Sequence, residues 1–231
     1  MVDEAKKGFD LLVVGMDKVT GAKEGFDRKI EEVTAGFEGP LAIIVAKGNH
    51  LKQPASDGFK ILVPVSGSAV SRRGAEIAIA LARPRATSLG VMYVSTTRDK
   101  GVRRNSASVS LLKEEAILKD TVALAARYDV DVTTSLRASA APEEAVLQEI
   151  RNSGADLVVM GVDRIQGDSL NFGSVADAVL RKSKVSVLLI SNALSHIQAS
   201  LGVGRQRAQG RARHEGVFRE ATSGSRWGRR R

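Results

Sequence analysis

The chain has 231 residues, of which 43% are hydrophobic and 26% are charged, proportions that are ordinary for a soluble globular protein. It contains no cysteine, which excludes disulfides and thiolate chemistry, and its three histidines are too scattered to suggest a metal site. The net charge is +9, but nine arginines and two glutamates from Ser195 onward contribute +7 of it, which leaves +2 for residues 1–194.

Neither end of the chain suggests a membrane segment. The N-terminus, MVDEAKKGFD, is polar and unlike a signal peptide, and no apolar run reaches the roughly 18–20 residues that cross a bilayer. We therefore expect a cytoplasmic protein. Residues 193–231 are rich in Arg, Gly and Ser, and we expect a disordered basic tail there rather than a nucleic-acid-binding segment.

Residues 1–46 alternate in the order strand, helix, strand. Segments 9–16 (FDLLVVGM) and 40–46 (PLAIIVA) are nearly continuous apolar runs, typical of strands that are buried on both faces. Between them, residues 24–37 carry apolar side chains at helical spacing. The polar segment 47–58 contains Pro and Gly and is predicted to be a linker.

The next part of the chain, residues 59–192, continues the alternation and is predicted to form one complete domain. The expected strands are 59–65, 88–95, 130–137, 155–161 and 185–191, and the expected helices are 71–83, 108–128, 141–154 and 173–183. Such alternation predicts a parallel sheet with helices on both of its faces.

Two stretches of the chain repeat each other at an offset of 146 residues, GFDLLVVGMDKVTG (8–21) and GADLVVMGVDRIQG (154–167). Seven of their positions are identical, including the glycines and the aspartates around each strand. The strands that follow, LAIIVA and VLLIS, align after a slip of one residue. The simpler explanation is that parallel sheets reuse one strand-to-turn geometry. We favour a duplicated domain whose first copy is only its last strand, helix and strand, too small to be stable unless it packs on the complete copy.

The complete unit resembles the universal stress protein family. The resemblance rests on ILVPVSGS (61–68), on ADLVVMG (155–161), and on the Gly-Ser pair at 173–174 that leads to a helix and to VSVLLIS (185–191). It implies an α/β fold with a doubly wound, five-stranded parallel sheet of the adenine nucleotide alpha hydrolase-like type, in strand order 3-2-1-4-5, with the partial β-α-β repeat before it. It also implies a nucleotide at the carboxyl ends of the first and fourth strands.

Nucleotide-binding members of that family are similar to G-x2-G-x9-G-[ST] after the fourth strand. Gly161 matches the first glycine and Gly173 with Ser174 the last pair, but the middle glycine falls on Arg164 and the spacing is one residue short. Ser66 stands where such members have an aspartate that engages the nucleoside. The implied cofactor is ATP or AMP, with Mg²⁺ only alongside the nucleotide. The expected pocket residues are Pro64, Val65, Ser66, Gly161, Asp163, Arg164, Gly167, Gly173, Ser174 and Val175.

Helix physics explains why this pattern suits a phosphate. Backbone N–H groups at the start of the helix at Ser174 face an anion, and the helix dipole favours it. Arg164 either neutralises phosphate charge or fills the pocket with its bulk. Asp163 either binds ribose or a metal, or has the more usual role of a turn residue. In the first copy, Asp27 and Arg28 replace the Gly-Ser pair, so we expect no nucleotide there.

No nucleophile–base pair and no paired catalytic carboxylates stand out, so we predict a non-catalytic regulatory domain of the stress response with a degenerate nucleotide pocket. The alternative is the cytoplasmic regulatory tail of a sodium/proton antiporter that binds no nucleotide. The family resemblance also implies a contact through the last strand. That contact forms either in a homodimer or within one chain, as a pseudo-dimer in which 41–46 pairs with 186–191.

Overall fold

The computed structural model describes residues 11–16, 34, 37–48, 60–85, 87–96, 104–164 and 170–193, and gives no side-chain description for residues 85 and 104–110. Three sequence predictions therefore lie wholly or mostly outside the described residues. These are the helix at 24–37, of which Thr34 alone is described as helical, the linker at 47–58, and the basic tail.

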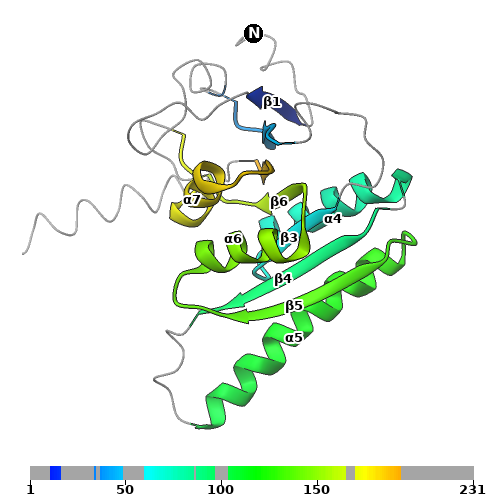
Figure 1. The fold of residues 1–231 in the computed structure, drawn as a ribbon, viewed down its shortest axis with the longest axis vertical. Coiled ribbons are helices and arrows are strands. Elements are labelled where there is room, and N and C mark those ends of the chain that lie inside the picture. The colour runs from blue at the N-terminus through cyan, green and yellow to red at the C-terminus, as the bar shows by residue number, and fades with distance from the viewer. Residues whose placement is uncertain are drawn as a thin grey trace, which may run out of the picture. The chain divides into compact units, whose positions relative to one another are not determined.

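Among the residues that the structure describes, seven strands form one sheet in the order β1-β2-β7-β6-β3-β4-β5 (Figure 1). The strands are β1 (Leu12–Met16), β2 (Leu41–Val45), β3 (Ile61–Val65), β4 (Leu89–Ser95), β5 (Val132–Ala138), β6 (Leu157–Gly161) and β7 (Ser186–Ser191). Neighbouring strands are parallel except β2 and β7, which are antiparallel. Among themselves, the five strands β3 to β7 of the complete domain are parallel, as predicted, and they lie in the order β5-β4-β3-β6-β7. The sheet is wider than five strands because β1 and β2 join it at the edge of β7.

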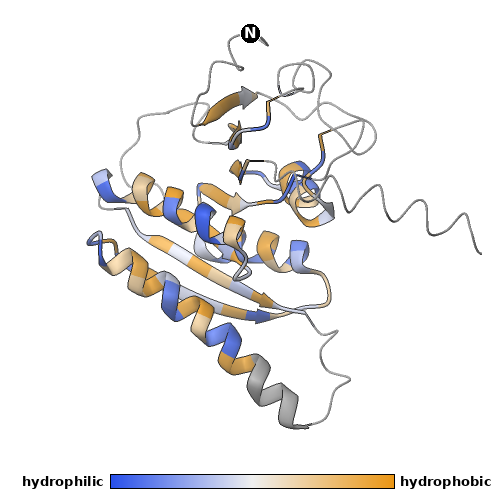
Figure 2. Ribbon diagram, turned by 180° about the vertical axis from the view of Figure 1, so that it is seen from behind, coloured by the Kyte–Doolittle hydropathy of each residue, from blue (hydrophilic) through white to orange (hydrophobic). Residues whose placement is uncertain are grey.

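Helices cover both faces of this sheet. They are α4 (Ala69–Ala82), which a single 3-10 turn η1 (Arg83–Arg85) follows, α5 (Arg104–Ala126), α6 (Pro142–Ser153) and α7 (Ser174–Lys182). Apolar residues of α6 and α7 pack in one core cluster on one face, and those of α4 and α5 pack in a second cluster on the other. Hydrophobic residues run along the strands between the two clusters (Figure 2). None of the described helices combines the length and the apolar character that a membrane span requires.

Local sequence signals explain where the helices begin and end. Ser68 caps α4, because its hydroxyl accepts a hydrogen bond from the backbone N–H of Ser71, so this helix begins at residue 69 rather than at the predicted 71. α6 begins at Pro142 and ends before Gly154, which has φ 64°, the expected helix-terminating conformation. α5 begins at Arg104, four residues before the predicted start at 108.

The junction between β2 and β7 joins the N-terminal strand pair to the rest of the sheet. The register pairs Leu41 with Ser191 and Val45 with Val187. Just beyond β2, the Lys47 ammonium donates to the backbone carbonyls of Leu180 (2.6 Å) and Ser183 (3.0 Å) at the end of α7. A cation at a helix C-terminus also interacts favourably with the helix dipole. Backbone pairing and a side-chain contact thus act together at this junction.

Lys47→Met is expected to lower the free energy of unfolding by about 1–2 kcal/mol. Hydrogen bonds from a charged donor contribute about 1.5–3 kcal/mol, but burial lowers the pKa of Lys47, which shows that desolvation offsets part of the gain. Urea unfolding measures the change. Lys184→Met is the matched control, because Lys184 is exposed and should cost less than about 0.5 kcal/mol. Equal losses in the two variants would remove the assigned role of Lys47.

Candidate functional site

The ends of β3 and β6 lie at one edge of the sheet, where several of the predicted site residues stand. The two strands are parallel neighbours, with Ile61 opposite Leu157, and they end at Val65 and Gly161. α7 connects β6 to the parallel strand β7, so its N-terminus lies at the edge where β6 ends. The loops after β3 and β6 and the start of α7 therefore share the carboxyl edge, the usual position of ligands in such sheets.

The loop after β3 is held by a short chain of serine hydrogen bonds. Ser66 is exposed, its backbone N–H donates to the Ser71 hydroxyl (2.8 Å), and its own hydroxyl lies 3.1 Å from that of Ser68. Gly67 has φ 79°, a conformation that favours glycine. The two strand residues before this loop differ in burial, Pro64 being half-buried and Val65 buried. Ser66 is thus presented at the edge but supplies no negative charge.

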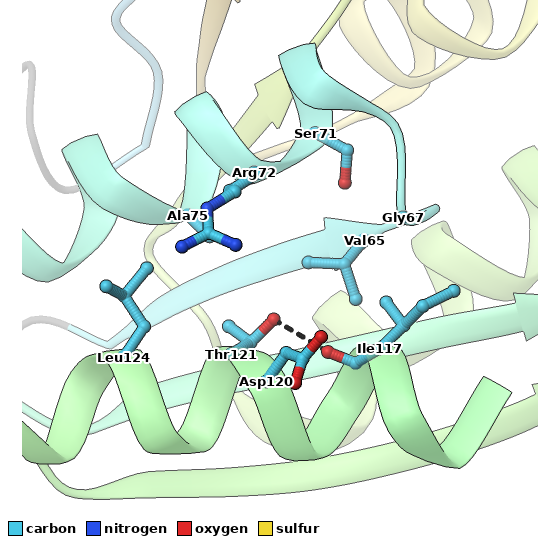
Figure 3. A pocket seen from close by; sticks show the side chains of 9 residues that line it. All are labelled: Val65, Gly67, Ser71, Arg72, Ala75, Ile117, Asp120, Thr121 and Leu124. Carbon is cyan, nitrogen blue, oxygen red and sulfur yellow. Dashed lines mark hydrogen bonds between the residues drawn. The ribbon is translucent and has the colours of Figure 1, made fainter. Parts of the chain in front are cut away.

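A small cavity lies between α4 and α5 beside the end of β3 (Figure 3). Its volume is about 100 Å³, and its lining includes Val65, Ser71 and Arg72 from one side and Asp120 and Thr121 from α5. Ligand pockets for molecules of nucleotide size usually measure about 300–1,000 Å³. The cavity therefore accommodates water rather than a nucleotide, and Val65 points into it.

Gly161 has a packing role that its family motif did not indicate. A Cβ atom on Gly161 would lie 1.8 Å from the Val70 carbonyl oxygen and 2.7 Å from the Ser71 Cα. A Cβ on Gly74, within α4, would lie 2.6 Å from the Gly161 backbone nitrogen. The two glycines therefore let the first turns of α4 rest directly on the end of β6. Gly74 was missed by the sequence analysis, although a glycine inside a helix costs about 1 kcal/mol and so signals close packing.

Arg164 is turned toward the N-terminal part of the chain. Its side chain is 9% exposed, and its guanidinium donates to the backbone carbonyls of Phe37 (2.8 Å) and Gly39 (2.9 Å), just before β2. Desolvation lowers the pKa of Arg164, and the nearby charge of Glu38 partly opposes this shift. The sequence left two roles open for this arginine, and the hydrogen bonds show a third, a structural link to the segment before β2.

The start of α7 is the best-formed anion-facing feature of the carboxyl edge. Gly173 precedes the helix with φ 88° and ψ 161°, and within the described residues no side chain caps the helix. The Gly173 backbone N–H donates to the side-chain oxygen of Asn171 (2.7 Å). Ser174 is exposed, whereas Val175 packs partly against the core. Asp177, in the first turn, forms an ion pair with Arg181 (2.8 Å).

Two of the expected pocket residues, Asp163 and Gly167, say little about where a ligand would bind. Asp163 is exposed after β6, and Gly167 lies outside the described residues. Among the residues that the structure describes, no group of three or more His, Cys, Asp or Glu side chains could hold a metal ion. The carboxyl edge therefore gathers Ser66, Gly173 and Ser174, while Val65 and Arg164 face elsewhere.

Comparison with known proteins identifies the family. Residues 59–191 match the model of the universal stress protein family, and the chain belongs to this family. No curated protein sequence matches the chain at a significant level.

Solved structures with a similar fold include the hypothetical protein MJ0577, with a TM-score of 0.51 and 20% identity over 61% of this chain and all of that one. A universal stress protein from Archaeoglobus fulgidus DSM 4304 has a TM-score of 0.51 and 19% identity, and the match covers 80% of this chain and 64% of that one. A universal stress protein solved in complex with cAMP has a TM-score of 0.47 and 22% identity over 59% of this chain and 98% of that one.

Proposed function

We propose that the chain is a non-catalytic regulatory domain that binds an adenine nucleotide, ATP or AMP, at the carboxyl edge of β3 and β6. The observation that carries the proposal is the start of α7, where Gly173 has a positive φ, Ser174 is exposed and no described side chain caps the helix. Backbone N–H groups at such a helix start bind phosphate oxygens, and the helix dipole adds to the attraction. Membership of the universal stress protein family supports the nucleotide as the ligand.

The same residues imply that binding is weak. Ser66 offers a hydroxyl where nucleotide-binding relatives are expected to offer a carboxylate, and this hydroxyl already contacts Ser68. Arg164 holds the carbonyls of Phe37 and Gly39, so its guanidinium is not directed at a phosphate on the α7 side. We therefore expect a dissociation constant of about 0.1–1 mM, which corresponds to about 4–5.5 kcal/mol of binding free energy. Mg²⁺ is expected only as a companion of the nucleotide phosphates.

Ser174→Asp is expected to weaken ATP binding at least about tenfold. The new carboxylate would lie where the phosphate settles, and like charges repel. Acidic residues in the first turn stabilise a helix, so the variant should keep its thermal stability. Calorimetric titration of ATP and AMP, with and without Mg²⁺, measures the affinity. Ser174→Ala is the control, because it retains the backbone amides and should bind within about threefold of the wild type. Unchanged affinity in Ser174→Asp would remove the site assignment.

A second reading is a regulatory domain attached to a sodium/proton antiporter, with no nucleotide bound. One observation weighs against the nucleotide, namely that Arg164 is engaged in a structural contact and is not directed at a phosphate. The attachment to an antiporter itself rests on the family resemblance alone. The titration distinguishes the two readings. Absence of heat at millimolar ATP and AMP would end the first reading, whereas saturable heat would end the second.

We also propose that the chain forms its pseudo-dimer contact internally. Support comes from the antiparallel pairing of β2 with β7, which uses the edge of the last strand that a second subunit would otherwise occupy. The two parallel pairs, β1 with β2 and β6 with β7, then meet around an approximate two-fold axis, as in an isologous contact between subunits. The proposal treats the N-terminal unit as a partial second copy of the domain.

A further inference from the structure

An apolar groove lies beside α4 on the sheet face that α4 covers, in the part of the sheet formed by β1, β2 and β7. Its volume is about 670 Å³, and it is lined by residues of β1, β2 and β7 and by the outer side of α4, including Ile77 and Leu81. Two of the lining residues are strongly exposed for their type, Val13 at 61% and Leu11 at 38%. Exposed apolar surface of this kind usually marks an interaction site.

The internal repeat shows what covers the same residues in the complete domain. At the offset of 146, Val13 corresponds to Val159, which is fully buried, and Leu11 corresponds to Leu157, which is 5% exposed. The registers of the two strand pairs keep the same offset. Val13 lies opposite Ala42, and Val159 lies opposite Leu188, which is likewise 146 residues after Ala42. The one-residue slip that the sequence suggested is therefore absent. In the complete domain, β3 and α4 provide the cover.

A pair of glycines, Gly15 and Gly161, shows most clearly that β1 is equivalent to β6. Gly161 allows the backbone of α4 to approach, since a Cβ there would lie 1.8 Å from the Val70 carbonyl oxygen. Its repeat equivalent, Gly15, has no such neighbour, and the nearest described atom to a Cβ there is Ile44 Cγ2 at 3.9 Å. Gly15 faces the same side of β1 as Val13, because alternate residues of a strand share a face. The first copy thus has the glycine that receives a helix, but no helix of the described residues packs on it.

We propose that Leu11, Val13 and Gly15 form the docking site for a strand followed by a small-residue helix, supplied by a partner polypeptide and similar in chemistry to β3–α4. The strand pairs with the outer edge of β1, the terminal strand of the described sheet, and the helix enters the groove beside α4. The helix needs Gly or Ala where it meets Gly15, as α4 has Gly74 at Gly161. A folded second copy of this chain cannot supply the segment, because its own β3 lies between β4 and β6.

The test uses a fluorescently labelled peptide with the sequence of residues 59–85, which contains β3 and α4, added to the full chain. Fluorescence anisotropy is expected to show saturable binding to the wild type. Gly15→Ala should weaken binding at least about tenfold, since its Cβ blocks the helix backbone, and Val13→Asp should abolish it. Leu112→Asp, at an exposed position of α5, is the matched control and should bind like the wild type.

Three results would overturn the proposal. The first is no binding to the wild type, or binding equal to that of a scrambled peptide. The second is undiminished binding to Gly15→Ala when circular dichroism shows that the variant is folded. The third is a dimer of the wild type in analytical ultracentrifugation that Val13→Asp dissociates and that the peptide does not dissociate. The groove would then bind a second copy of the chain. None of these results depends on nucleotide binding, so this proposal and the nucleotide site stand or fall separately.

Discussion

Gly161→Ala is expected to lower the free energy of unfolding by at least about 3 kcal/mol, a large fraction of the roughly 5–15 kcal/mol that stabilises a typical domain. The new methyl group would lie 1.8 Å from the Val70 carbonyl oxygen and 2.7 Å from the Ser71 Cα, both of them backbone atoms of α4. A backbone cannot rotate away as a side chain can, so α4 would have to move off β6. Because α4 carries part of the core on its face of the sheet, the loss is global. Urea unfolding followed by circular dichroism measures it.

Gly15→Ala is the matched control for that change. Gly15 occupies the equivalent strand position in the repeat, and a Cβ there would be in ordinary contact with Ile44 Cγ2 at 3.9 Å. We expect a change in the free energy of unfolding of less than about 0.5 kcal/mol. A Gly161→Ala protein as stable as the Gly15→Ala protein would show that α4 does not press on β6 as described.

Arg164→Met is expected to lower the free energy of unfolding by about 2 kcal/mol, with the loss concentrated in β1 and β2. The substitution keeps an apolar stem but removes both donors to the carbonyls of Phe37 and Gly39. Leaving buried carbonyls unpaired costs about 1–3 kcal/mol each. Removal of a buried charge offsets part of this loss of stability, because the charge no longer has to be desolvated; desolvation already lowers the pKa of Arg164. Hydrogen exchange of the β2 amides should accelerate more than that of the β4 amides.

The control for this variant is Arg73→Ala. Arg73 is exposed on α4 and forms an exposed ion pair with Glu76 at 3.5 Å, which should be worth less than about 0.5 kcal/mol. If Arg164→Met leaves the hydrogen exchange of the β2 amides unchanged, the guanidinium does not hold the segment before β2. Arg164 then becomes a candidate phosphate ligand again.

The sequence was most informative about the order of the elements and least informative about contacts between distant segments. Apolar runs and helical periodicity located the strands and most helix bounds of the complete domain, because those patterns report burial directly. The start of α5 was placed late, since residues 104–107 are polar or small and carry no apolar periodicity. Apolar runs also located β1 and β2, but the sequence repeat aligned β2 with β7 after a slip of one residue, because side-chain similarity is weaker information than hydrogen-bonded register.

The candidate site divides in the same way. Gly173 and Ser174 could be placed at a helix start from sequence alone, because the family resemblance puts a Gly-Ser pair directly before a helix. The partners of Arg164 lie more than 120 residues away, and nothing local to Arg164 indicates them. The assignment of Gly161 to a phosphate loop overlooked Gly74, because two glycines far apart in sequence show their common function only when α4 rests on β6.

The most direct test of the proposed nucleotide site is an ATP titration of the full chain followed by backbone amide NMR. We predict saturable shift changes concentrated at residues 66–68 and 173–176, with half-saturation at about 0.1–1 mM. The tail is an internal control, because its nine arginines attract any polyanion. Shift changes confined to residues 195–231, or no change at the α7 start at millimolar ATP, would contradict the site.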